Sequence, residues 1–208
     1  MSTAHDEFAA GKTYTESFNV ASADGTTKAV TIVMTGTNDA AVIGGVSAMN
    51  LTETNAVQTT GGQLTITDVD SAATFVAQAT AVGSNGFGKF TLDATGKWTY
   101  TMNTAHDEFK DGVTYTDSFT AVSADGTTKL VTVTMIGTND AAVIGGVSTA
   151  ALTESNAIQT TSGQLTATDV DSAATFNVQT AVTGSNGYGS FSIDATGKWT
   201  YTMGSAHD

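Results

Sequence analysis

In the stretch Trp98-Thr99-Tyr100-Thr101-Met102, every second side chain is apolar and threonine lies between them. This alternation is typical of a β-strand that buries one face, because successive side chains of a strand point to opposite faces. The same residues recur at 199–203, and the stretch Val131-Thr132-Val133-Thr134-Met135 alternates in the same way. No segment keeps the helical period of about 3.6 residues. The pattern therefore predicts an all-β chain.

The sequence repeats itself with an offset of 101 residues. Ala-His-Asp at residues 4–6 recurs at 105–107 and at 206–208, and Asp-Val-Asp at 68–70 recurs at 169–171. No insertion or deletion interrupts this register, so two periods account for 202 of the 208 residues. A repeat of this length predicts a tandem array of equivalent domains.

Turn signals separate the alternating runs within each period. They include Ser84-Asn85-Gly86 and Ala124-Asp125-Gly126, and an Asp-Gly pair between two alternating runs is a strong signal for a β-hairpin. In the complete period we expect seven strands, at about 46–53, 62–68, 75–83, 88–93, 97–103, 114–123 and 127–137. Seven short strands in about 100 residues predict an Ig-like β-sandwich. The expected fold is therefore a series of tandem seven-stranded Ig-like β-sandwiches, arranged end to end.

The repeat divides the chain into three parts. Residues 1–39 supply the last two strands of a preceding repeat, 40–140 form a complete repeat, and 141–208 supply the first five strands of the following one. A sandwich that lacks two strands exposes its core and an unpaired edge. One hypothesis is that residues 1–39 of one copy complete residues 141–208 of another, head to tail, which would propagate a filament. The alternative is a window of a longer polymer, because Met1 lies in register with Met102 and Met203.

The composition is strongly acidic. There are 20 acidic residues against 7 basic ones, all of them lysine, which gives a formal charge of −13. This charge argues against binding to nucleic acid, whose phosphates attract basic side chains. It suits a protein that binds divalent cations or stays soluble by self-repulsion. Cysteine is absent, which excludes disulfides and thiol chemistry, and without an apolar run of about 18 residues no membrane insertion is expected.

Acidic and amide side chains fall at the ends of the expected strands. Because the strands of a sandwich alternate in direction, Glu53 and the residues near 107 and 140 should share one end of a repeat. The Asp-x-Asp motifs should lie at the other end, where the preceding linker arrives. Calcium binds six to eight oxygens at about 2.3–2.6 Å in irregular geometry and fits such a set better than Mg²⁺ does. We expect Ca²⁺ sites at the junctions between repeats, formed by Asn38, Asp39, Glu53, Asp68, Asp70, Asp107, Glu108, Asn139, Asp140, Asp169 and Asp171.

Other polar residues have simpler explanations. Asp24 and Asp125 lie in Asp-Gly hairpins, where hydrogen bonds to the local backbone explain them as well as a metal would. Each repeat supplies a single histidine, whereas zinc needs several nitrogen or sulfur ligands together. His5, His106 and His207 are therefore expected in surface loops.

Several motifs resemble those of the VCBS-type repeat, and the resemblance extends over the whole chain. They include Leu51-Thr52-Glu53, the stretch Thr67-Asp68-Val69-Asp70-Ser71, and the closing Gly137-Thr138-Asn139-Asp140-Ala141. Such repeats occur in large RTX-type adhesins of Gram-negative bacteria, which a type I system secretes and which act in biofilm formation. The resemblance implies an extracellular, calcium-binding extender at the bacterial cell surface, whose partners are neighbouring repeats or, head to tail, other copies of the chain.

The order of motifs also resembles cadherin repeats, which bind Ca²⁺ between domains. That resemblance implies ligands at Glu53, Asp68, Asp70, Asn139 and Asp140, with Asp107 or Glu108 as a further contributor. One departure concerns the linker, because Ala40-Ala41 and Ala141-Ala142 stand where the family usually has proline. The linker should therefore depend more on metal for its stiffness.

Two other functions are alternatives to the extender. An enzyme is not expected, because the sequence has no cysteine or arginine and no nucleophile elbow or phosphate-binding loop. A carbohydrate-binding module would need an exposed aromatic platform, for which Trp98 and Tyr100 are the candidates. Their alternation with threonine places them on the inward face instead, as part of the core.

Overall fold

The computed structural model of the chain describes residues 4–153 and 155–205, and His207 therefore lies outside the described residues. These residues form strands and loops without any helix, so that no helix capable of crossing a membrane occurs among them. They form two compact units. The first extends to His106 and includes Thr114–Ile136, and the second comprises Asp107–Val113 and the residues from Gly137 onward.

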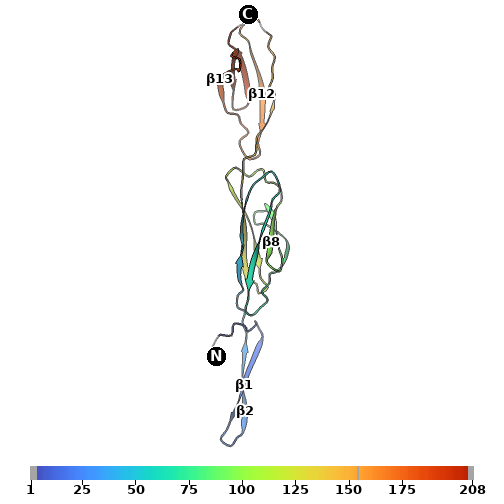
Figure 1. The fold of residues 1–208 in the computed structure, drawn as a ribbon, viewed down its shortest axis with the longest axis vertical. Coiled ribbons are helices and arrows are strands. Elements are labelled where there is room, and N and C mark those ends of the chain that lie inside the picture. Colours follow the sequence, from blue (N-terminus) through green and yellow to red (C-terminus); the bar gives the residue numbers. More distant parts are fainter. Residues whose placement is uncertain (1–3, 154, 206–208) are drawn as a thin grey trace. The chain divides into compact units, whose positions relative to one another are not determined.

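The first unit contains a sandwich of two sheets (Figure 1). The larger sheet has the order β3-β5-β8-β7-β6, and its strands are β3 (Val42–Gly45), β5 (Thr59–Thr67), β6 (Gln78–Val82), β7 (Gly88–Leu92) and β8 (Lys97–Met102). The smaller sheet has the order β4-β10-β9, and its strands are β4 (Ala48–Thr52), β9 (Thr114–Val122) and β10 (Thr128–Ile136). Strand β4 runs parallel to β10, whereas the other pairs are antiparallel. The all-β sandwich expected from the sequence is confirmed.

The first expected strand, 46–53, corresponds to β4, whereas β3, directly before it, was not expected from the sequence and belongs to the other sheet. Strand β3 pairs with β5, and β4 pairs with β10. The chain changes sheets after Gly45, which has a φ of 84° and lies so close to β5 that a Cβ would meet the Gln63 carbonyl oxygen at 2.4 Å. The backbone N–H of Val46 still donates to Gln63 (2.8 Å), while Ser47 already accepts from Thr132 (2.9 Å). The sequence Val42-Ile43-Gly44-Gly45 does not alternate, so the pattern that predicted the other strands did not predict β3.

The core lies between the two sheets. Phe90, Trp98 and Tyr100 are fully buried on the inner face of the larger sheet. The Phe119 ring of β9 packs at 4.6 Å from Phe90, between ring centroids, and the Trp98 indole N–H donates to the Val46 carbonyl at 2.7 Å. The prediction that Trp98 and Tyr100 are core residues is confirmed, and in this repeat they offer no surface on which a sugar could stack.

A carboxylate is buried in this apolar core. Asp117 of β9 accepts hydrogen bonds from the backbone N–H groups of Asn85 (2.8 Å) and Gly88 (3.0 Å) and from the Tyr100 hydroxyl (3.2 Å). Burial raises the pKa of Tyr100 well above its usual value, and the Asp117 charge raises it further. Asp117 thus joins the loop before β7 to the strand β9 of the opposite sheet.

Two further pieces repeat parts of this sandwich. Within the second unit, a five-stranded sheet has the order β11-β12-β15-β14-β13, formed by β11 (Val143–Gly146), β12 (Thr160–Thr168), β13 (Gln179–Thr183), β14 (Gly189–Ile193) and β15 (Lys198–Met203). In the first unit, β1 (Thr13–Ala21) and β2 (Thr27–Thr35) form a separate hairpin. The repeat boundaries at 39/40 and 140/141 stay predictions.

We expect Asp117→Ala to lower the free energy of unfolding by roughly 3 kcal/mol, because it leaves buried donors without an acceptor. The matched control is Glu16→Ala, which changes the equivalent position of the exposed hairpin and should alter stability by less than about 0.5 kcal/mol. Urea unfolding followed by tryptophan fluorescence in a Trp199→Phe background, where Trp98 is the reporter, measures the difference. Equal midpoints for the two variants would contradict the role given to Asp117.

Candidate metal centre

The first acidic cluster lies where the linker enters the complete sandwich, in the loop that follows β5. Asp68 shapes this loop by accepting the backbone N–H groups of Asp70 (3.1 Å) and Ser71 (2.7 Å) and the Ser71 hydroxyl (2.6 Å). The Ser71 hydroxyl is the main reason that the pKa of Asp68 is lowered. Asp68 is therefore held in its charged form next to Asp70.

Asp70 is the aspartate of this cluster whose negative charge is poorly compensated. Its Oδ2 accepts the backbone N–H of Asp39 at 3.3 Å, whereas its Oδ1 is buried and has no hydrogen-bond partner among the described residues. Burial raises the pKa of Asp70, and the negative charges of Asp68 and Asp39 raise it further. A cation bound at Oδ1 would offset both the cost of burying the Asp70 charge and its repulsion from Asp68 and Asp39.

The second unit contains the same arrangement. Asp169 accepts the backbone N–H groups of Asp171 (3.2 Å) and Ser172 (2.8 Å). Asp171 is only 5% exposed, and neither of its carboxylate oxygens has a hydrogen-bond partner among the described residues. Burial is the largest cause of its raised pKa, followed by the Asp169 side chain, and the Asp140 charge adds to the effect. In both places, an aspartate with a lowered pKa lies two residues before an aspartate with a raised pKa.

Three further acidic side chains are shielded from solvent. Glu53 of the first unit and Asp140 of the second are buried, and Asp107 of the second unit is half-buried with its Oδ1 shielded from solvent. Carboxylate oxygens are ligands that a hard divalent cation binds. Glu108 is exposed.

The two linker asparagines shape the backbone beside the clusters. The side-chain amide of Asn38 donates to the Asp39 carbonyl (3.1 Å), and that of Asn139 donates to the Asp140 carbonyl (2.8 Å). The structure thus brings Asp39 to the loop of Asp70 and Asn38 to Asp125, and it brings Asp140 near Asp171. Whether these residues and the other expected ligands bind metal stays a prediction.

Asp125 has a contact that sequence reasoning missed. In its hairpin it accepts the Thr127 N–H (3.1 Å) and the Ser123 hydroxyl, as a turn residue does. It also accepts the Ala41 N–H (2.9 Å) and the Asn38 side-chain amide (3.4 Å). The Ser123 hydroxyl and then the Ala41 N–H hold its pKa far below the usual range. Asp125 therefore fixes the linker to the β9–β10 hairpin.

Two other aspartates, Asp93 and Asp194, are exposed to solvent and lie in turns. Asp93 accepts the N–H and hydroxyl of Thr95 (2.9 and 2.6 Å) and the N–H of Lys97 (3.0 Å). Asp194 makes the equivalent bonds to Thr196 and Lys198. These two residues close turns, which separates them from Asp70 and Asp171.

Residues 38–137 match the family model of the bacterial cadherin-like domain. The match includes both Asp68 and Asp70 and supports a cadherin-like repeat of the Ig type. No match to a curated protein was found.

The solved structures that resemble the chain include two protocadherins. PcdhgB3 EC1-4 is 12% identical with a TM-score of 0.47, and the match covers 95% of this chain and 58% of that one. The Protocadherin GammaB4 extracellular domain is 14% identical with a TM-score of 0.46, and the match covers 97% of this chain and 37% of that one. The chain thus spans less than two thirds of either structure.

We expect Asp125→Ala to speed hydrogen exchange of the Ala41 amide by about tenfold, because a hydrogen bond to a charged acceptor contributes roughly 1.5 kcal/mol. The matched control is Asp24→Ala in the hairpin one period earlier, where Asp24 accepts the Ser22 hydroxyl and the Thr26 N–H. Amide exchange measured by NMR should show no change at Ala41 in that control. Unchanged exchange at Ala41 in Asp125→Ala would refute the anchoring of the linker.

Proposed function

We propose that this chain is a calcium-stiffened extender of a bacterial surface adhesin, a series of β-sandwich repeats that projects distal binding domains from the cell. The observation that carries the proposal is the burial of Asp171, whose carboxylate oxygens have no hydrogen-bond partner among the described residues. A buried carboxylate requires donors or a cation, and here Asp169 and Asp140 add negative charge. Calcium would supply the missing compensation.

The residues present fit calcium better than other common metals. The clusters contain carboxylate, amide and backbone oxygens, which are the hard ligands that Ca²⁺ prefers, and the chain has no cysteine for a soft metal. Asp171, with Asp169, Asp140 and Asn139, would hold an ion in one repeat. Its counterpart one period earlier is formed by Asp70, Asp68, Asp39 and Asn38, and Glu53 and Asp107 are further candidate ligands.

Bound calcium would stiffen the chain through the linkers. Asp39 and Asp140 belong to the segments that connect consecutive repeats, whereas Asp70 and Asp171 belong to loops of the repeats that follow. Without a cation, the like charges repel each other and loosen this connection. With a cation, the linker is held to the next repeat even though it has Ala40-Ala41 in place of proline.

The motifs and the family match together support a finer identity as a proposal. The bacterial cadherin-like match suggests an adhesion or extender role, and such a domain is typically non-catalytic. The VCBS-type motifs favour an RTX-type adhesin that is exported by type I secretion and acts in biofilm formation. Neighbouring repeats of the same chain would be its main partners.

Asp171→Ala should bind fewer calcium ions than the unchanged chain in isothermal titration calorimetry. Each lost site should also remove about 2.7 kcal/mol of stabilisation at a calcium concentration of 100 times Kd. Asp194→Ala is the matched control, because Asp194 already accepts its hydrogen bonds in a turn. The site assignment fails if Asp171→Ala binds calcium like the unchanged chain, or if Asp194→Ala loses as much.

Small-angle X-ray scattering tests the stiffening itself. In millimolar calcium we expect a narrow, extended distribution of interatomic distances, and in excess chelator a broader and more compact one. Magnesium should restore little of the extension, because it gives up its hydration shell reluctantly. Identical scattering in chelator and in calcium would argue against an extender whose stiffness depends on calcium.

A further inference from the structure

The loop between β6 and β7 contains an Asn-Gly pair, Asn85-Gly86, that plays no part in the proposed calcium sites. The pair forms a tight turn, in which the Gly86 N–H donates to the Gly83 carbonyl at 3.0 Å. Gly86 has a φ of 77°, a conformation that favours glycine. Both residues of the pair are exposed, so water reaches them. The same pair occurs one period later at Asn186-Gly187, where the glycine again has a positive φ, of 74°.

An Asn-Gly pair can modify itself. The backbone nitrogen of Gly86 can attack the side-chain carbonyl carbon of Asn85, because glycine has no Cβ to hinder the approach. The new C–N bond closes a succinimide ring, the bond from that carbon to Nδ2 breaks, and ammonia leaves with the proton of the Gly86 N–H. Water then opens the ring at either carbonyl and leaves aspartate or isoaspartate at position 85. Water is the only co-reactant, and it is present at this exposed turn.

In the complete repeat, the opposite sheet holds this turn in place. The backbone N–H of Asn85 donates to Asp117 Oδ1 (2.8 Å), and its side-chain amide donates to the Thr116 carbonyl (2.6 Å). The Asn103 side-chain amide donates to the Gly86 carbonyl (2.5 Å). The attack requires the Gly86 nitrogen to give up its hydrogen bond in the turn and the Asn85 amide to leave Thr116. The closed loop therefore slows the reaction, and an open loop permits it.

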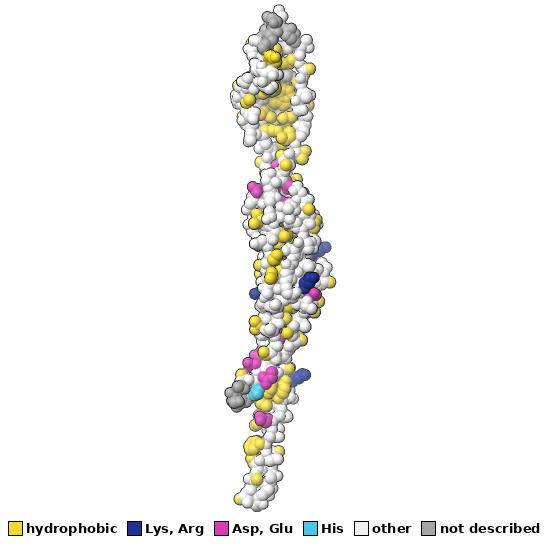
Figure 2. Space-filling view, in the orientation of Figure 1, with side chains coloured by type: hydrophobic (Ala, Val, Ile, Leu, Met, Phe, Trp, Pro, Cys, Tyr) yellow, Lys and Arg dark blue, Asp and Glu magenta, His cyan; other side chains and the backbone are white. Residues whose placement is uncertain are grey.

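The products fit this place poorly. At Asn85 an NH2 donor becomes a negatively charged oxygen, which then faces the Thr116 carbonyl oxygen and repels it. The new charge also lies close to the Asp117 carboxylate, to which the same residue donates its N–H. The chain already has a formal charge of −13, and Figure 2 shows only scattered lysines on its visible face. In isoaspartate the main chain is longer by one carbon, so the turn is broken as well.

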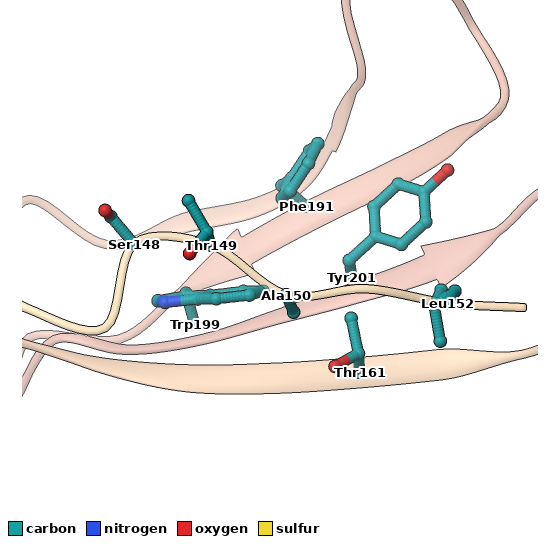
Figure 3. Close-up of a pocket in the computed structure, with 8 residues that line it drawn as sticks. All are labelled: Ser148, Thr149, Ala150, Leu152, Thr161, Phe191, Trp199 and Tyr201. Atoms are coloured by element: carbon teal, nitrogen blue, oxygen red, sulfur yellow. The ribbon is translucent and has the colours of Figure 1, made fainter.

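Asp117 transmits this change to the core. Besides N–H groups of the loop it accepts the Tyr100 hydroxyl at 3.2 Å. The Tyr100 ring packs on Phe90 with ring centroids 4.6 Å apart. Figure 3 shows the equivalent pair of the second unit, Phe191 and Tyr201, whose centroids lie 4.7 Å apart. A loosened loop in the complete repeat therefore weakens the link between β9 and the aromatic rings of the larger sheet.

We propose that Asn85 is a deamidation site that acts as a one-way switch of the stability of this repeat. While β9 holds the loop, the amide survives. Each opening of the loop gives the Gly86 nitrogen access to the Asn85 side chain, and the ammonia that leaves does not return. A repeat that has reacted then opens more readily than one that has not. The site does not depend on the proposed calcium function, since the contacts of the loop given above include none of the expected ligands.

Peptide mapping by mass spectrometry measures how much of residue 85 has lost its amide after incubation of the full chain at mildly alkaline pH. We expect Asp117→Ala to speed this reaction by about tenfold, because it removes the charged acceptor of the Asn85 N–H. Asn103→Ala changes an exposed residue, keeps the core intact and should also speed the reaction, since it frees the Gly86 carbonyl. The unchanged chain should react fastest when urea unfolds it.

Leu64→Ala is the matched control, because Leu64 is buried in the same core but lies near the opposite end of β8 from the loop. At a temperature where all the variants are folded, it should speed the reaction much less than Asp117→Ala does. The proposal is overturned if residue 85 keeps its amide even in urea, or if it reacts as fast in the folded chain as in urea. An equal acceleration by Leu64→Ala and Asp117→Ala would also overturn it.

Asn85→Asp tests the consequence of the reaction. Urea unfolding in the Trp199→Phe background should show a lower midpoint for this variant than for the unchanged chain. The midpoint should also be lower than that of Asn85→Ala, which loses the bond to Thr116 but adds no charge beside Asp117. A midpoint of Asn85→Asp equal to that of the unchanged chain would overturn the role of the site as a switch.

Discussion

Aspartate side chains that are buried beside one another destabilise a fold unless donors or a cation compensate their charge. Asp70 and Asp171 are in this situation at equivalent places, since each follows an aspartate that is held in its charged form by a turn. The arrangement occurs in both periods. It differs from that of Asp93, whose carboxylate accepts hydrogen bonds within its own turn. The proposed divalent cation would explain the arrangement, and the proposed stiffness of the linkers would follow from it.

The sandwich supplies the frame on which this interaction depends. Its core consists of aromatic rings on the larger sheet covered by the β9–β10 hairpin, and Asp117 locks the two sheets together. That same hairpin carries Asp125, which accepts the Ala41 N–H of the linker. Core packing and linker geometry are therefore connected through one hairpin. The β1–β2 hairpin and the sheet of the second unit repeat the corresponding parts of this sandwich.

Much of the fold could be predicted, because alternation and turn residues are local signals. The strands Lys97–Met102 and Thr128–Ile136 lie within one residue of their expected ends. Strand β3 (Val42–Gly45) could not be predicted, since its sequence does not alternate and only its pairing with β5 reveals it. In the candidate site, the repeat drew attention to the aspartates, and strand direction placed them at the two ends of each repeat. The contact of Asp125 with Ala41 and the burial of Asp117 depend on residues far away in the sequence, where local patterns carry no information.

The most direct test of a cation between these carboxylates is an anomalous difference map from crystals grown with calcium and soaked with a lanthanide. The account predicts peaks within about 2.3–2.6 Å of the carboxylate oxygens of Asp70 and Asp171. Density without any peak there, with those oxygens hydrogen-bonded to protein or water, would contradict it.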